Sequence, residues 1–223
     1  MQTYLEQELS NIKIKIFEMA DLVIEALESS ITALKNSDIE LAKKIMKDDT
    51  VMDLLEIDID NECIKLLVTR QPAASDLRFV LAMLKINTDL ERMGDLATNI
   101  SKEVIKINGA PLMKPLIDIP RMTERAIQMT RLSFEAITEK DVEKAKNVIL
   151  MDEEIDQLNL QIYRELFTFM SESASNITQS LSLILIAKAL ERVGDHAKNI
   201  AERGIYFIQG EDIRHRDVRE TIK

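Results

Sequence analysis

The segment ERMGDLATNI at residues 91–100 returns as ERVGDHAKNI at residues 191–200. Seven of the ten positions are identical in the two copies. Self-similarity at a long, fixed spacing indicates that the chain arose by doubling one structural unit. Any chemistry that the decapeptide carries is therefore expected twice.

The composition of the 223-residue chain favours helices throughout. It contains 5 Gly, 4 Pro and no Trp, and aromatic residues make up only 4% of it. Long stretches consist instead of Leu, Ile, Ala, Glu, Lys and Met, which are good helix formers. The sequence therefore predicts an all-α protein.

Apolar spacing and helix-stop signals predict six helices of roughly 30 residues. They cover about residues 4–34, 37–69, 75–108, 121–137, 141–170 and 176–209. Ser37 and Glu40 form a capping-box pattern at the start of the second helix, and Ser75 is the expected cap of the third.

The one stretch with linker-like punctuation contains Pro111, Pro115 and Pro120. We therefore divide the chain into residues 1–109 and 110–223. With short loops, each half is predicted to be an antiparallel three-helix bundle, and the whole a tandem duplication.

The third and sixth helices are expected at the centre of the molecule. Their segments 77–86 and 177–190 are apolar nearly all round, which predicts burial on more than one side. Gly94 and Gly194 lie mid-helix, where glycine costs about 1 kcal/mol relative to alanine, so we expect them to let these two helices approach each other.

Each decapeptide also carries an acidic pair, Glu91 with Asp95 and Glu191 with Asp195. The i, i+4 spacing places each pair on one helix face, opposite the apolar stripe. Like charges at this spacing repel, so a pair kept in both copies invites a cation.

The second helix of each half carries a matching pair. These pairs are Asp49 with Asp53, and Asp152 with Asp156. Antiparallel neighbours could bring four carboxylates together, and such oxygen donors suit Mg²⁺, Mn²⁺ or iron better than zinc. The alternative is a solvated acidic face, which is the ordinary role of any single pair in a chain with 30% charged residues.

Other polar residues of the decapeptides have less defined roles. Arg92 and Arg192 are interpreted as ordinary ion-pair residues. Asn99 and Asn199 are candidates either for metal ligands or for interhelical hydrogen bonds. His196 has Leu96 as its counterpart, so a ligand role shared by both halves is excluded and a structural role is favoured.

Charge and hydropathy limit the partners. A formal net charge of −10 argues against nucleic acid and against charge-driven attachment to anionic membranes. We find neither a signal-peptide pattern nor an apolar run of about 20 residues that could span a bilayer. The lone Cys63 is interpreted as a small buried residue, and a cytoplasmic location is expected.

The segment LLVTRQPAASDLRFVLAMLKINTDLERMGDLATNI, with ALERVGDHAKNIAE and the Asp pairs at 49 to 53 and 152 to 156, resembles the PhoU family of phosphate-signalling and phosphate-transport accessory proteins. The resemblance covers essentially the whole chain. It implies tandem three-helix bundles and a non-enzymatic regulator. The segment TFMSESASNIT at 168–178 replaces the TRQP-type loop, so a partner contact of that loop is expected in one copy only.

The resemblance further implies a set of partners and ligands. Such regulators restrain a phosphate-responsive sensor histidine kinase and the ATPase-driven phosphate ABC transporter when phosphate is plentiful. A homo-oligomer, as a dimer, and membrane contact only through partners are expected. The family's metal positions, associated with iron, Mg²⁺ and Mn²⁺, map onto the eight carboxylates Asp49, Asp53, Glu91, Asp95, Asp152, Asp156, Glu191 and Asp195.

Three alternatives remain open. The chain could serve a different phosphate transporter, or it could be a bare helical scaffold. It could also be a di-metal enzyme, although the Glu-x-x-His pairs of ferritin-like di-iron helices are missing from the sequence.

Overall fold

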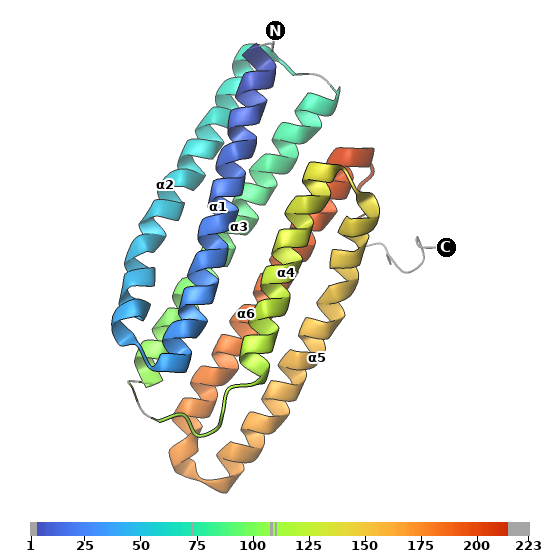
Figure 1. Cartoon of the computed structure of the whole chain (residues 1–223). Coiled ribbons are helices and arrows are strands. Elements are labelled where there is room, and N and C mark those ends of the chain that lie inside the picture. Colours follow the sequence, from blue (N-terminus) through green and yellow to red (C-terminus); the bar gives the residue numbers. More distant parts are fainter. Residues whose placement is uncertain (1–3, 73, 108, 110, 214–223) are drawn as a thin grey trace.

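A computed structural model describes residues 4–72, 74–107, 109 and 111–213. This part of the chain is almost entirely helical and contains no strand, so the predicted all-α fold is confirmed. Its elements are α1 (Tyr4–Asn36), α2 (Ile39–Arg70), α3 (Ala74–Ile107), α4 (Asp118–Glu139), α5 (Val142–Glu172), the 3-10 helix η1 (Ala174–Asn176) and α6 (Ile177–Gln209) (Figure 1).

The six long helices form two antiparallel three-helix bundles, α1–α3 and α4–α6, as predicted (Figure 1). The most extensive contact between any two helices is that of α3 with α6, which run in opposite directions. Edge-to-face pairs of Phe79 with Phe207, at 5.4 Å, and of Phe17 with Phe134, at 5.1 Å, also join the bundles. The predicted central position of α3 and α6 is confirmed.

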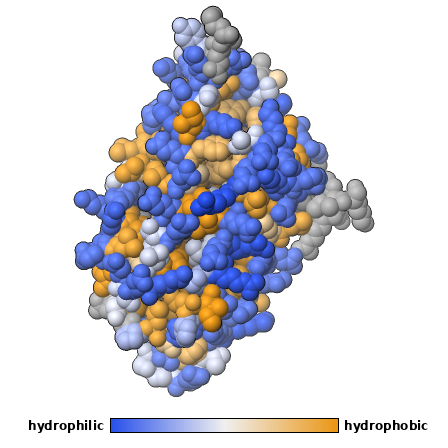
Figure 2. Space-filling model, in the orientation of Figure 1, coloured by the Kyte–Doolittle hydropathy of each residue, from blue (hydrophilic) through white to orange (hydrophobic). Residues whose placement is uncertain are grey.

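The burial of these two helices is less complete than predicted. Leu77 and Leu81 on α3 and Ile177, Leu181 and Leu185 on α6 are each between 37% and 51% exposed. They lie at every fourth residue, on the one face of each helix that neither bundle covers. Figure 2 shows apolar side chains scattered among hydrophilic ones on one side of the molecule.

The start of α2 differs from its prediction. Asp38 caps the helix, because its Oδ1 accepts a hydrogen bond of 2.9 Å from the backbone N–H of Leu41. Ser37 has φ 53°, in the left-handed region, whereas a capping residue needs the extended backbone that Asp38 has at φ −87°. Glu40 lies 2.7 Å from Lys43 and is not bonded to the cap. The predicted capping box at Ser37 was therefore wrong.

The predicted cap of α3 was also wrong, because α3 begins at Ala74 and Ser75 lies within its first turn. The cap of α5 repeats that of α2: Asp141 accepts a 3.0 Å hydrogen bond from the backbone N–H of Lys144. Matching aspartate caps are what a duplicated unit should show.

Replacing Asp38 by alanine should lower the free energy of unfolding by about 1 kcal/mol, because the first-turn N–H groups of α2 lose their acceptor. Replacing the adjacent Ser37 by alanine should change it by less than about 0.5 kcal/mol. Urea denaturation followed by circular dichroism measures both. Equal losses in the two variants would contradict the assignment of Asp38 as the cap.

The segment that precedes α4, which contains Pro111 and Met113, is hydrogen-bonded to α6. The backbone N–H of Met113 donates to Gln179 Oε1 at 2.6 Å, and Gln179 Nε2 donates to the carbonyl of Pro111 at 3.1 Å. Pro120 lies in the first turn of α4, where its missing N–H is not needed. The domain boundary between residues 109 and 110 stays a prediction. In the described ranges, no helix combines the length and apolar character needed to cross a membrane.

Cys63 occupies the core of the first bundle, as predicted, with its side chain fully buried. Burial, followed by the nearby charges of Asp60 and Glu62, raises the pKa of the thiol to about 12. The thiol is therefore protonated at neutral pH and behaves as a small apolar side chain.

Candidate metal centre

The predicted metal-binding carboxylates lie on two neighbouring antiparallel helices in each half, α2 with α3 and α5 with α6. On each helix, the two acids of a pair are four residues apart and share one face. Whether the two pairs of one half meet depends on how the helices are rotated toward each other.

Gly94 and Gly194 set the distance between the helices of each half. A Cβ atom at Gly94 would lie 3.6 Å from Asp49 Oδ1, and one at Gly194 would lie 3.7 Å from Asp152 Oδ1. The glycines therefore face α2 and α5 of their own halves, and their predicted role between α3 and α6 was wrong. Their missing side chains leave room for Met52 and Ile155, which an added Cβ atom would approach to 2.9 Å and 2.8 Å.

The four predicted carboxylates of the first half lie close together. Burial raises the pKa of Asp49, and the charges of Asp53 and Asp95 raise it further. Burial also raises the pKa of Glu91, followed by the charges of Asp95 and Glu56. Each group thus experiences the negative charge of its neighbours on α2 and α3.

Two further acids belong to this group, Glu56 and Asp60 on α2. Burial raises the pKa of Glu56, followed by the charges of Asp60 and Asp53. Asn87 Nδ2 donates at 2.9 Å both to Asp60 Oδ1 and to the backbone carbonyl of Glu56, which ties this end of the group to α3. These two residues were not predicted from the sequence, although they continue the stripe of Asp49 and Asp53 along one face of α2.

We call this group the first-half cluster; it consists of Asp49, Asp53, Glu56, Asp60, Glu91 and Asp95. The corresponding second-half cluster consists of Asp152, Asp156, Glu191 and Asp195. Burial raises the pKa of Asp156 and of Asp195, and in each case the charge of Asp152 raises it further. The second set of predicted residues is therefore also brought together.

Two lysines lie within the second-half cluster. Lys198 Nζ lies 2.7 Å from Oδ2 of Asp152, whose side chain is almost fully buried. Lys188 Nζ donates to both carboxylate oxygens of Glu191, each at 2.7 Å. In both ion pairs, a predicted metal ligand, Asp152 or Glu191, is already paired with a lysine of the chain.

Both clusters offer oxygen donors, which Mg²⁺, Mn²⁺ and iron accept. Among the described residues, no group of three or more His, Cys, Asp or Glu side chains has the arrangement of a metal site. In the first half, the hydroxyl of Thr98 lies beside Asp49, and its hydrogen bond favours the charged form of that carboxylate. The oxygen donors of the carboxylates fit a hard cation in chemistry, and metal binding stays a prediction.

The other polar residues of the decapeptides lie elsewhere. His196 Nδ1 is 2.8 Å from Oδ1 of the buried Asp89, and Asn199 Nδ2 donates to the same oxygen at 3.3 Å. This contact joins α6 to α3 across the two halves, so the predicted structural role of His196 is supported. Asn99 accepts a hydrogen bond of 3.2 Å from Lys102 Nζ.

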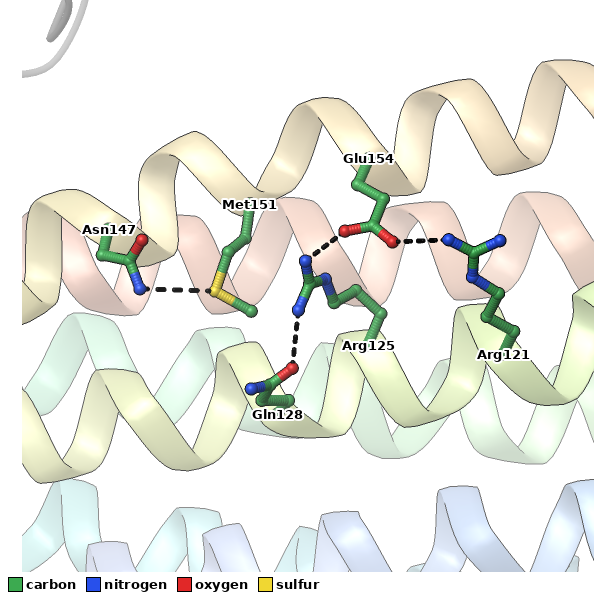
Figure 3. A network of polar contacts seen from close by, with 6 residues as sticks. All are labelled: Arg121, Arg125, Gln128, Asn147, Met151 and Glu154. Carbon is green, nitrogen blue, oxygen red and sulfur yellow. Dashed lines mark hydrogen bonds and ion pairs between the residues drawn. The ribbon is translucent and has the colours of Figure 1, made fainter.

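The opposite side of α5 is attached to α4 by a network around Glu154 (Figure 3). Arg121 Nη2 lies 3.1 Å from Glu154 Oε1, and Arg125 donates to Oε2 of the same carboxylate and to Gln128. Burial alone would raise the pKa of Glu154, but the hydrogen bonds and charges of the two arginines outweigh it and the pKa is lowered. The network helps to position the helix that presents Asp152.

Comparison with known proteins identifies a repeated domain. The family model described as "PhoU domain" matches residues 16–104 and again residues 119–204. The two matches lie in the two halves and contain the two acidic clusters.

Full-length relatives are similar over nearly the whole chain. The phosphate-specific transport system accessory protein PhoU homolog of Aquifex aeolicus is 39% identical over 214 residues, 96% of this chain and 97% of that protein. PhoU of Escherichia coli is 32% identical, over 93% of this chain and 86% of its own. The crystal structure of PhoU from Pseudomonas aeruginosa has a TM-score of 0.88 at 32% identity, covering 92% of this chain and 99% of that one.

Proposed function

Because the chain belongs to the PhoU family, with a PhoU domain in each half, we propose that it is an accessory protein of a phosphate-specific transport system. It acts as a non-enzymatic, negative regulator of phosphate uptake and of phosphate-responsive signalling. The observation that carries this proposal is the similarity to such accessory proteins along nearly their whole length.

The proposed partners are the ATPase of the phosphate ABC transporter and a phosphate-responsive sensor histidine kinase. The protein works in the cytoplasm as a homo-oligomer, a dimer in the simplest case, and reaches the membrane through these partners. Its surface supports a docking role, because exposed apolar residues lie on the same helices as the second-half cluster. Leu181 and Leu185 are within three turns of Glu191 on α6, and Phe167 on the neighbouring α5 is 59% exposed.

Metal binding belongs to the same proposal. Iron, Mg²⁺ or Mn²⁺ bound by the acidic motifs would supply positive charge at surfaces that otherwise repel acidic partners. The oxygen-only donor set supports this part.

A genetic test uses a host whose own gene for this protein is deleted and which carries a reporter for phosphate-starvation genes. We expect the deletion to raise reporter expression at high phosphate, and the wild-type chain to restore repression. The double variant Leu181→Asp/Leu185→Asp should fail to restore it and should lose co-purification with the ATPase and the kinase.

The variant Glu40→Lys is the control, because the Glu40 side chain is 82% exposed and lies on α2, a different helix from Leu181 and Leu185. It should behave as the wild type. Normal repression by the Leu181→Asp/Leu185→Asp variant would exclude this docking surface. Unchanged reporter expression after the deletion would refute the regulatory function itself.

A further inference from the structure

The groove between α1 and α2 contains a hollow, whereas side chains of the chain itself bridge the equivalent groove between α4 and α5. We propose that this hollow binds an arginine on a basic, amphipathic segment of a partner protein, as a substitute for the Arg125 of the second half. The inference rests on the proposed function, because the segment is expected on the ATPase or on the kinase. It concerns a second surface, since the docking residues named above lie on α5 and α6.

The hollow has a volume of about 210 Å³. Its apolar lining consists of Leu22, Ala26, Leu41, Ile45, Val51 and Met52. Ile45 and Met52 are buried, whereas Val51 is 53% exposed, so the hollow opens from the core to the surface. An apolar cavity of roughly 150 Å³ takes up benzene, and this hollow therefore has room for one long side chain.

The second half has an ion pair in this place. The caps of α2 and α5, at positions 38 and 141, are 103 residues apart. By this spacing Leu22 corresponds to Arg125, and Val51 corresponds to Glu154. Arg125 donates to Glu154 and so bridges α4 and α5 (Figure 3). In the first half, two apolar side chains replace this bridge.

Smaller residues add to the space between α1 and α2. Ala26 corresponds to Met129, which is fully buried in the second half. Asp48 corresponds to Met151, which is also buried and whose Sδ lies 3.9 Å from Asn147 Nδ2. The hollow therefore follows from residue differences between the two copies of the repeat.

The charged residues of the hollow favour a guanidinium group. Glu25 corresponds to Gln128, which accepts a 2.8 Å hydrogen bond from Arg125. A carboxylate thus replaces this amide acceptor, and Asp48 adds a second carboxylate, against the one ammonium group of Lys44. The stem of an arginine packs on apolar side chains while its guanidinium donates to carboxylates. An arginine from outside therefore finds an apolar lining for its stem and acceptors for its charged group.

A second hollow adjoins the first along α1. The two share Leu22 and Glu25, and the second is also lined by Phe17 and by Ile14, which is 61% exposed. Its charged residues are Lys13, Glu18, Asp21 and Glu25. Together the hollows follow α1 from position 10 to position 29, about five turns of helix. A single side chain is too short to fill both, so a helix with basic and apolar residues on one face is the fitting occupant.

The first test uses the full-length protein with ¹³C-labelled methyl groups and propylguanidinium, which is a free copy of the arginine side chain. We expect saturable NMR shifts at Ile45, Val51 and Met52, and none at Ile155, the counterpart of Met52. Propylurea, the neutral isostere, should bind at least threefold more weakly. Equal binding of the two compounds, or no saturable shift in the groove, would contradict an arginine site.

Residues of the second half supply the matched variant. Leu22→Arg/Val51→Glu, the closed variant, gives α1 and α2 the ion pair that joins α4 and α5, so propylguanidinium binding should weaken at least tenfold. Glu25→Gln/Asp48→Asn should weaken propylguanidinium binding and leave propylurea binding unchanged. Far-UV circular dichroism and thermal unfolding check that both variants are folded. Wild-type affinity of a folded closed variant would place the compound outside this groove and overturn the inference.

Co-purification with the ATPase and the kinase then identifies the occupant. The closed variant should bind one of these two partners at least tenfold more weakly than the wild type does. If it retains both, this inference is wrong and the proposed function is intact; if the wild type binds neither, both are refuted. A lower sedimentation coefficient of the closed variant alone would assign the groove to a second copy of the chain and overturn the assignment to a different protein.

Discussion

Replacing His196 by leucine is expected to lower the free energy of unfolding by about 3 kcal/mol. Asp89 is 8% exposed, and its Oδ1 lies 2.8 Å from His196 Nδ1. Without the imidazole, this buried carboxylate keeps only the 3.3 Å hydrogen bond from Asn199. The variant should unfold at lower urea concentration with an unchanged dependence on urea, since the surface exposed on unfolding stays the same.

The repeat itself supplies the control. Leucine is the residue at the equivalent position 96, and the position equivalent to Asp89 is Ala189. The double variant Asp89→Ala/His196→Leu therefore gives this contact the residues of its counterpart, and its stability should return to within about 1 kcal/mol of the wild type. A double variant as unstable as His196→Leu alone would show that the loss arises from leucine packing and not from the unpaired carboxylate.

Replacing Gly194 by leucine is expected to cost about 2 to 3 kcal/mol of stability through overpacking. A Cβ atom at this position would lie 2.8 Å from Ile155 Cδ1 and 3.4 Å from its Cγ2, and Ile155 is fully buried. The branched side chain cannot retreat, so α5 and α6 must separate. Thermal unfolding and amide hydrogen exchange of α5 should both report the loss.

Gly94→Ala is a comparison in which the added atom meets a flexible side chain instead of a branched one. The Cβ atom would lie 2.9 Å from Met52 Cε, at the far end of a flexible side chain that can rotate away. The gain of about 1 kcal/mol in helix propensity offsets this contact, so the stability should remain within about 1 kcal/mol of the wild type. Wild-type stability of Gly194→Leu would show that the α5–α6 groove can widen without cost.

Features that depend on spacing along one helix could be predicted from the sequence. Apolar residues at helical intervals predicted the six helices, and the repeat predicted two bundles with α3 and α6 at the centre. The members of each acidic pair share a face because residues four apart do so on any α-helix, and their role as metal ligands stays a prediction.

Features that depend on backbone conformation or on a neighbouring helix could not be predicted from the sequence. Ser37 and Asp38 are both good capping residues, and only their dihedral angles show that Asp38 is the cap. The glycines of the two decapeptides were correctly interpreted as points of close approach, but the approaching helix is α2 or α5. The position of a glycine in the sequence does not specify which helix packs against it.

The sequence by itself determined the duplication, the helical periodicity and the acidic stripes, since all three follow from residue order along single helices. Only the tertiary structure decided that Lys198 forms an ion pair with Asp152, and that Asp89 meets His196. These pairings join residues on different helices. They depend on the rotation and axial offset of one helix against another, which packing of the whole core determines.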